Sequence, residues 1–238
     1  MDPTVYEEGR ASSTPELPAM IPLGDDSRHP TNFPIVTVFI IVACVIVFVM
    51  ELIGGDAFVT QWSVIPAQVT AGHGWITIIT STFLHASWFH IIGNMVFLWA
   101  FGPEIEDAMG SGRYLFFYLL GGIVANVAQI AAIPTSTIPN LGASGAIAAV
   151  MGAFLVTYPR DEILTVIIFG FFVRVTEVSA GLLIGIWFVL QLFNLGAVAQ
   201  SNTGGIAYLA HVGGFVFGAV FGRLFEDRSR IEEMSLRE

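Results

Sequence analysis

Lysine is absent from this 238-residue chain, and cysteine occurs only once, as Cys44. A single cysteine excludes an intramolecular disulfide, and no cysteine–histidine spacing typical of a zinc site involves it. Because Cys44 lies within a long apolar run, we expect it to act as a small apolar side chain that fills space between helices. We expect no metal and no other cofactor.

Charged residues are also scarce, at 12% of the chain, whereas hydrophobic residues make up 55% and the mean hydropathy is +0.75. Soluble domains carry roughly 25% charged residues. The nine basic residues form no basic patch that could neutralise phosphates, so we expect no nucleic-acid partner. Several apolar runs reach the roughly 20 residues that a bilayer-spanning helix needs. The composition therefore predicts a polytopic membrane protein.

The two ends of the chain are polar and carry much of the net charge of −10. Residues 1–32 are acidic and contain proline and serine, without a basic segment or a cleavage pattern. They are typical of a flexible tail rather than of a signal peptide. We predict three parts: this tail, a transmembrane domain over residues 33–225, and a cytoplasmic tail over residues 226–238.

The middle part is predicted to be an all-α bundle of six transmembrane helices. They cover Phe33–Ile53, Ser87–Met109, Tyr114–Ile133, Ser144–Tyr158, Val178–Leu195 and Gly205–Leu224, with Gly54-Gly55 ending the first. The fourth is short, roughly 22 Å long against a hydrocarbon core of about 30 Å. The apolar stretch Ile163–Val173 is also short and precedes Arg174. It is either an interfacial segment or an early start of the fifth helix.

Arginine positions predict how the bundle is oriented. Loops one, three and five contain no arginine; the arginines lie in the N-terminal tail (Arg10, Arg28), loop two (Arg113), loop four (Arg160, Arg174) and the C-terminal end (Arg223, Arg228, Arg230, Arg237). Positive residues remain cytoplasmic, so both termini are expected inside and the odd-numbered loops outside.

Polar residues of three predicted helices then fall at one depth. Helices two, four and six all enter from the outer face; Ser144 begins the fourth, and His211 lies six residues into the sixth. Asn94 lies at a similar depth in the second helix, one turn after His90. Ionisable groups inside a membrane are costly and usually functional.

Small residues would let the fourth and sixth helices approach closely. The sixth helix has a stripe of glycines at every fourth position, Gly214, Gly218 and Gly222. The fourth helix has a face of small residues, Gly145, Ala148, Ala149 and Gly152. We therefore predict a hydrogen bond between Ser144 and His211, which is the arrangement of a nucleophile with its base. No acidic residue lies in the outer half of these helices, so the sequence predicts a dyad rather than a triad.

Donors for an oxyanion are present nearby. His90 and Asn94 are spaced i, i+4 and share a helix face, and backbone N–H groups at the start of a helix lack intrahelical partners. Gly142 and Gly145 let substrate and backbone come close to Ser144. Nucleophile, base and oxyanion donors together indicate acyl transfer.

Three ordered motifs carry these residues and resemble the rhomboid family of intramembrane serine proteases. They are Gly142-Ala143-Ser144-Gly145, then Ala210-His211-Val212-Gly213-Gly214 with Gly218, and the segment His85–Asn94; the resemblance covers roughly Trp75 to Leu224. It implies Ser144 as nucleophile, His211 as general base and His90 with Asn94 as oxyanion hole. It also implies a structural or water-organising role for His85. The segment Gly102–Gly110 around Glu106 resembles a further family pattern.

The chain departs from this family at two places. Many members have a Trp-Arg pair in loop one, where this chain has Ile76 and Thr77. Some members place a tyrosine four residues after the serine to stack on the histidine, where this chain has Ala148. These departures concern the anchoring of loop one and the packing of the histidine, and leave the catalytic groups in place.

The predicted function is hydrolysis of peptide bonds in or near transmembrane segments of other proteins, with the lipid bilayer as surroundings. A spanning helix must unwind before attack because its carbonyls are internally bonded. The fifth helix and loop five are the expected gate, by family resemblance. We expect a prokaryotic cell membrane, with the site open to the extracytoplasmic side; the oligomeric state is open. Alternatives are a catalytically silent rhomboid-like client-binding protein, or a small transporter, which would predict inverted repeats that the two halves lack.

Overall fold

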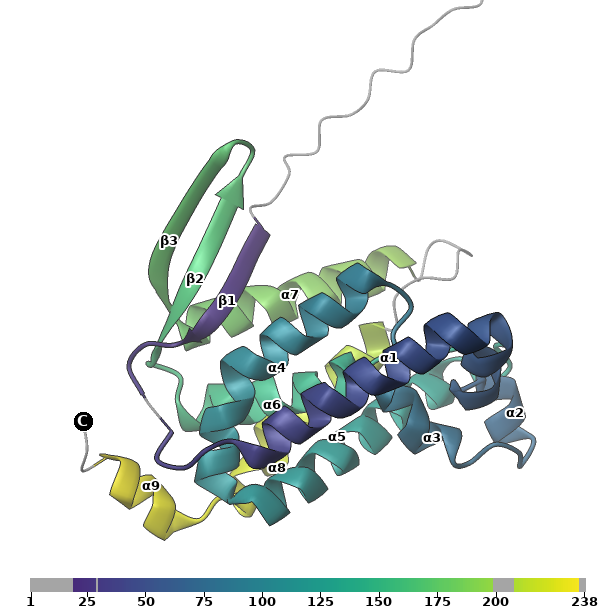
Figure 1. Cartoon of the computed structure of the whole chain (residues 1–238), viewed down its shortest axis with the longest axis horizontal. Coiled ribbons are helices and arrows are strands. Elements are labelled where there is room, and N and C mark those ends of the chain that lie inside the picture. Colours follow the sequence, from purple (N-terminus) through teal and green to yellow (C-terminus); the bar gives the residue numbers. More distant parts are fainter. Residues whose placement is uncertain (1–18, 29, 199–207, 236–238) are drawn as a thin grey trace, which may run out of the picture.

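The computed structural model describes residues 19–28, 30–198 and 208–235, and these form a helical bundle with a small sheet beside it (Figure 1). The long helices are α1 (Ile35–Trp62), α4 (Trp88–Met109), α5 (Ser111–Ala132), α6 (Ser144–Thr157), α7 (Ala180–Val198) and α8 (Tyr208–Phe225). Short helices are α2 (Pro66–Thr70), α3 (Thr77–Thr80), the 3₁₀ turn η1 (Ser81–Phe83) and α9 (Arg228–Ser235). The strands are β1 (Ala19–Asp25), β2 (Glu162–Phe169) and β3 (Phe172–Ser179).

Helix α6 occupies the centre of the bundle. Every residue from Gly145 to Phe154 is buried, and the helix packs against α4, α5, α7 and α8. Its most extensive neighbour is α8, as the two small-residue faces predict. The first residue of this central helix, Ser144, is half-buried and adjoins this buried stretch.

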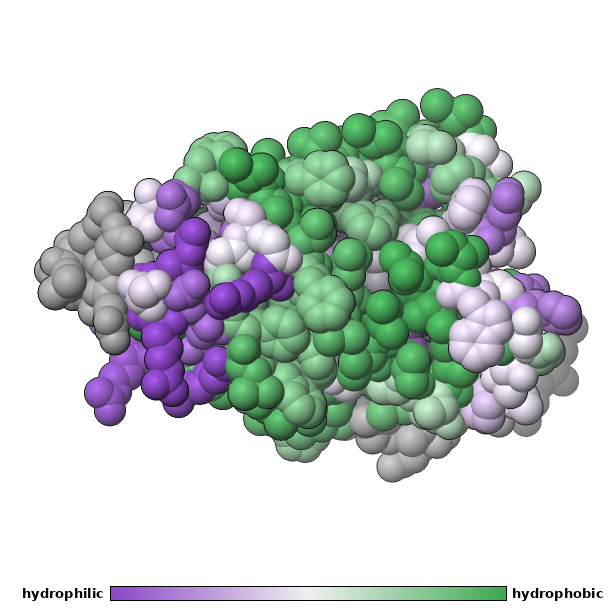
Figure 2. Space-filling view, turned by 90° about the horizontal axis from the view of Figure 1, so that it is seen from below, coloured by the Kyte–Doolittle hydropathy of each residue, from purple (hydrophilic) through white to green (hydrophobic). Residues whose placement is uncertain are grey.

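The outer helices are apolar enough for a membrane. Among the described residues, α1, α5 and α8 could each span a bilayer, and the pair α3/η1–α4, bent by 91°, could form a fourth span. The apolar helix α6 is shorter, at 14 residues, and α7 lies beside the sheet (Figure 1). Hydrophobic residues form a broad band on the visible face, and hydrophilic residues gather at its ends (Figure 2). The chain is a multi-pass integral membrane protein.

Helix boundaries agree with the sequence to within a few residues, except that α1 contains a second helical stretch. The first regular stretch of α1 ends at Gly54-Gly55, as predicted: Gly55 adopts the non-helical angles φ 60°, ψ −157°, and a second helical stretch within α1 follows this kink and ends at Trp62. Glycine tolerates the left-handed conformation that a kink of this kind needs. The predicted start of the last helix at Gly205 lies outside the described residues.

The described residues are mostly helical, as predicted, but the fold is not all-α, because β1, β2 and β3 form an antiparallel sheet in that order. The stretch Ile163–Val173 is not an early part of α7; it forms β2, a turn and the start of β3. Its β-branched residues favour strands, and Gly170, with φ 57°, makes the tight turn between Phe169 and Phe172. Ile163 and Thr165 are fully buried.

Part of the predicted flexible tail is also ordered. Ala19–Asp25, within the first 32 residues, is strand β1 and pairs with β2. Further along, the backbone N and the hydroxyl of Thr31 donate to the Asp107 carboxylate at 2.6 and 2.7 Å. Pairing partners far away in the sequence hold this segment, so its own composition gave no sign of order.

The Glu106 carboxylate joins the starts of two helices. It accepts hydrogen bonds from the backbone N–H groups of Val36 and Thr37 at 2.9 and 2.8 Å, and from the Thr37 hydroxyl at 2.9 Å. It also accepts one from the Ser111 hydroxyl at 2.7 Å. Pro34, the N-cap residue of α1, provides no side-chain cap. Glu106 therefore satisfies the N–H groups that α1 leaves open.

We expect Glu106→Ala to lower the free energy of unfolding by about 2–4 kcal/mol, because buried donors lose their only acceptor. Ser111→Ala, which removes one of the four bonds, should cost about 1 kcal/mol. Glu177→Ala, which removes an exposed carboxylate from β3, should change stability by no more than about 0.5 kcal/mol. Denaturant unfolding in detergent micelles measures all three. Equal stability of the Glu106 and Glu177 variants would contradict this capping role.

Candidate active site

The backbone before α6 places Ser144 at the floor of a cavity. Gly142 donates its N–H to the Ser81 carbonyl at 2.9 Å and has φ 134°, a conformation that favours glycine. A Cβ at Gly142 would lie 2.9 Å from Cε1 of His90, so only glycine leaves room for that ring. The chain then enters α6 at Ser144.

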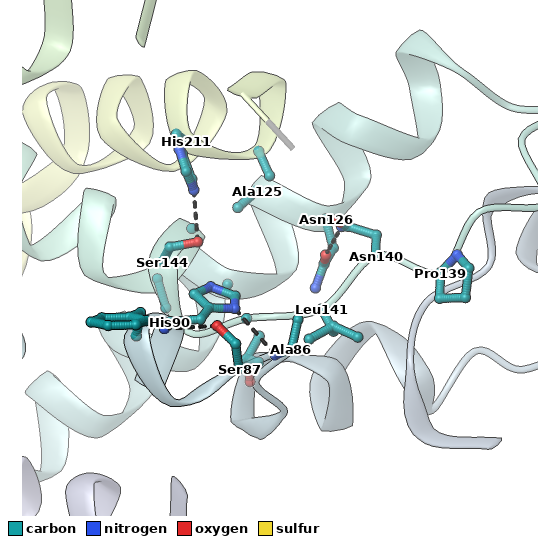
Figure 3. A pocket seen from close by; sticks show the side chains of 17 residues that line it. Ala86, Ser87, His90, Ala125, Asn126, Pro139, Asn140, Leu141, Ser144 and His211 are labelled. Atoms are coloured by element: carbon teal, nitrogen blue, oxygen red, sulfur yellow. Dashed lines mark hydrogen bonds between the residues drawn. The ribbon is translucent and has the colours of Figure 1, made fainter. Parts of the chain in front are cut away.

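Two glycines on α8 bring His211 to the serine. A Cβ at Gly214 would overlap the Gly145 carbonyl oxygen, and one at Gly218 would overlap that of Ala149. The backbones of α6 and α8 are thus in direct contact. His211 Nε2 lies 2.7 Å from Ser144 Oγ (Figure 3), which is the hydrogen bond that the sequence predicts.

His90 faces the same cavity from the start of α4 (Figure 3). Its Nδ1 accepts from the Ala86 N–H at 3.3 Å, which leaves the proton of the neutral ring on Nε2. Ser87 caps this helix through a bond from the His90 N–H to its hydroxyl at 3.2 Å. The Nε2–H of His90 is therefore available as a donor beside Gly142 and Ser144.

Asn94 and His85 do not line the cavity, unlike His90, which both of them contact. Asn94 is buried, donates one amide hydrogen to the His90 carbonyl at 3.0 Å, and does not line the cavity. His85 is 1% exposed and stacks edge-on at 5.2 Å from the His90 ring. Neither of its ring nitrogens has a hydrogen-bond partner among the described residues, whereas its backbone N–H donates to the Glu51 carboxylate.

The cavity has a volume of about 590 Å³ and is mainly apolar. Its walls include small residues of α5 and α6, namely Gly122, Ala125 and Ala146. A polar corner contains Asn126 and Asn140, whose side-chain amides are joined at 2.9 Å (Figure 3). Ligand-binding cavities typically measure about 300–1,000 Å³, so this one is large enough to hold a ligand next to the serine.

Comparison with known proteins decides the family. The model of the rhomboid domain matches residues 72–228, about two thirds of the chain. The chain belongs to the rhomboid family. The match spans the segments that carry His90, Ser144 and His211, and the resemblance of the three motifs is thereby confirmed.

Several curated relatives support this assignment. Rhomboid protease GluP of Bacillus subtilis is 28% identical over 219 residues, covering 83% of this rhomboid and 43% of the relative. Rhomboid-like protein 11, chloroplastic, of Arabidopsis thaliana is 33% identical over 159 residues, covering 61% and 51%. The mitochondrial presenilin-associated rhomboid-like protein of Homo sapiens is 30% identical over 149 residues, covering 59% and 35%. This rhomboid spans between about a third and a half of their lengths.

The sequence missed one polar contact of the site, made by Gln191 on α7. Its Oε1 lies 2.8 Å from Nδ1 of His211, and both side chains are only 9% exposed. The histidine thus has a partner on each ring nitrogen, although none of them is acidic. The available signal was an amide within an apolar helix, one of two there with Asn194, since polar groups in such helices are often functional.

Aromatic packing around the histidine comes from a different element than in relatives with a stacking tyrosine. The tyrosine position is Ala148, which is fully buried on α6. Instead the ring of Trp187 on α7 lies 5.9 Å from His211, and that of Tyr208 on α8 lies 6.3 Å away. Among the described residues, no group of three or more histidine, cysteine and carboxylate side chains could hold a metal ion.

Proposed function

We propose that this rhomboid is an active intramembrane serine endopeptidase that cleaves transmembrane segments of other proteins. The observation that carries the proposal is the 2.7 Å contact between Ser144 Oγ and His211 Nε2 inside a cavity. A serine hydroxyl becomes a competent nucleophile when an adjacent base accepts its proton. Membership of a family of intramembrane serine proteases supports the same reaction.

The first half of the reaction forms an acyl-enzyme. Nε2 of His211 accepts the hydroxyl proton as Ser144 Oγ attacks the substrate carbonyl carbon, which gives a tetrahedral intermediate with an anionic oxygen. The His90 Nε2–H and the backbone N–H groups of Ser144 and Gly145, in the first turn of α6, would stabilise that charge. Asn94, which does not line the cavity as the structure places it, would join them through its second amide hydrogen once its side chain turns toward the cavity. The imidazolium then donates its proton to the leaving amine, and the peptide C–N bond breaks.

The second half releases the product. A water molecule loses a proton to Nε2 of His211 and attacks the ester carbonyl of acylated Ser144. Collapse of this second intermediate returns the proton to Oγ and frees the new carboxyl terminus. Neither half needs a cofactor. The glycine and alanine walls beside Ser144 favour a small side chain at the cleaved residue, and local unwinding favours substrates with glycine or proline nearby.

We also propose that the chain has six spans and that both termini lie in the cytoplasm, as the arginine distribution predicts. The chain would consist of an N-terminal segment (residues 1–32) that contains strand β1, a transmembrane domain (residues 33–225) and a C-terminal tail (residues 226–238). The active site would then open on the extracytoplasmic side. A prokaryotic cell membrane stays a prediction, because the relatives come from a bacterium, from mitochondria and from a chloroplast.

A serine-directed probe tests the activity directly. Purified chain in detergent or liposomes is incubated with a fluorophosphonate or an isocoumarin, and the modified peptide is identified by mass spectrometry. We expect one covalent adduct, located on Ser144, because only this serine has its hydroxyl bonded to a histidine ring nitrogen among the described residues. A folded protein that forms no adduct and cleaves no transmembrane reporter would instead be a client-binding relative.

A further inference from the structure

The partner of His211 on its far side is held in a defined orientation. Gln191 Nε2 donates to the backbone carbonyl of Trp187, one turn earlier on α7, at 3.4 Å. A carbonyl can only accept, so the amide turns its NH2 group toward Trp187 and its Oε1 toward His211. Oε1 lies 2.8 Å from Nδ1.

This orientation selects one form of the histidine. An amide oxygen can only accept, so Nδ1 of His211 must carry a proton to use the contact. In a neutral imidazole the other nitrogen then has a free lone pair. That nitrogen, Nε2, is the one 2.7 Å from Ser144 Oγ. The opposite form, protonated on Nε2, would face the serine with a donor and could not accept its proton.

We propose that Gln191 is a positioning residue that holds His211 in the base-competent tautomer. The inference rests on the proposed function, because a tautomer preference matters only if His211 acts as a base. Gln191 performs without charge the orienting role that a carboxylate performs in a serine–histidine–aspartate triad.

Aromatic contacts already join α7 to α8, so Gln191 is not needed to hold these two helices together. The rings of Phe188 and Phe215 stack at 4.2 Å, and Trp187 packs on Phe215 at 6.2 Å. These apolar contacts hold the helices together without an amide. A buried amide costs free energy unless it is bonded, and Gln191 meets that requirement through the catalytic histidine.

The contact also links the base to α7. Ser144 and His211 sit on α6 and α8, whose backbones touch, whereas Gln191 sits on a helix that contacts α8 through side chains. An outward shift of α7 by about 1 Å would exceed hydrogen-bond range and release Nδ1. The base is therefore fully oriented only while α7 is packed against α8.

Two replacements separate orientation from packing. Gln191→Leu removes the acceptor and keeps the side chain apolar and similar in size. We expect its kcat on a transmembrane reporter to fall about 10- to 100-fold, with KM unchanged within about twofold, as for the loss of a buried hydrogen bond. Gln191→Glu restores an acceptor and should recover kcat to within about tenfold of the wild type. Leu192→Ala, at an exposed neighbouring position, is the control and should match the wild type.

Nitrogen-15 NMR of histidine-labelled protein gives a readout that does not require activity. The His211 signals, assigned by their loss in His211→Ala, should show a protonated Nδ1 in the wild type and in Gln191→Glu, and a mixture of tautomers in Gln191→Leu. A wild-type His211 protonated on Nε2 would overturn the inference. So would wild-type kcat in Gln191→Leu, or a Glu variant as slow as the Leu variant. The proposed function is tested separately: if Ser144→Ala abolishes cleavage, the serine mechanism holds even when the inference about Gln191 fails.

Discussion

Ser144→Ala is expected to lower kcat/KM for a transmembrane reporter by about 10⁴-fold or more, which is the loss seen when a catalytic nucleophile is removed. Among the described residues, Ser144 Oγ is the one hydroxyl that is hydrogen-bonded to Nε2 of His211. We therefore expect no other hydroxyl to act as nucleophile when Ser144 is replaced. The substitution removes one oxygen atom and leaves the helix start intact. We therefore expect the melting temperature in detergent to stay within a few degrees of the wild type.

A surface serine provides the comparison for this variant. Ser179, at the end of β3, is exposed, and Ser179→Ala should cleave the reporter at the wild-type rate. Both variants are assayed in the same liposomes, with the amount of folded protein measured by thermal unfolding. Substantial cleavage by Ser144→Ala, at equal folding, would exclude the serine mechanism.

The parts of the site that the sequence predicted correctly depend on helix periodicity and on residue size. Small residues at every fourth position of α8 and on one face of α6 require close packing, and this packing fixes the relation of Ser144 to His211. Most helix boundaries followed from apolar runs and from glycine or arginine at their ends. These signals are local, so a single sequence contains them.

The parts that the sequence did not predict depend on contacts between distant segments. An apolar run of the length of Ile163–Val173 is ambiguous between helix and strand by periodicity alone. Its resolution as β2 and β3 depends on pairing with β1, which lies in a segment with a polar composition. The Gln191 contact depends on how α7 is rotated against α8, and no local pattern specifies that rotation.

Asn94 illustrates the limit of helix-face arguments. Its i, i+4 spacing from His90 correctly puts both residues on one face, but the Asn94 amide donates to the His90 carbonyl and the side chain lies outside the cavity lining. Shared spacing fixes direction around a helix axis and leaves open which side chain reaches the cavity. The bend of 91° before α4 brings its first turn, with His90, to the serine.

The close approach of α6 and α8 leads to the second large expected effect. Gly218→Val should abolish probe labelling of Ser144 and lower the free energy of unfolding by about 3 kcal/mol or more. A Cβ at Gly218 would overlap the Ala149 carbonyl oxygen, which is backbone in the buried stretch of α6 and cannot rotate away. The helices must therefore separate, and the Ser144–His211 hydrogen bond depends on their spacing.

A graded series of alanine replacements isolates this packing from helix propensity, which alanine improves over glycine at every site. A Cβ added at Gly185 on α7 would have no atom within 4 Å, so Gly185→Ala should leave stability and labelling unchanged or slightly improved. At Gly222 the new Cβ would meet the Ala153 Cβ at 2.7 Å and its Cα at 2.9 Å, a less severe overlap than at Gly218 and one farther from Ser144, so the loss should be intermediate. Gly218→Ala should be the most severe of the three. If thermal unfolding and labelling ranked Gly185→Ala at or below Gly218→Ala, direct backbone contact between α6 and α8 could not be what positions the nucleophile and its base.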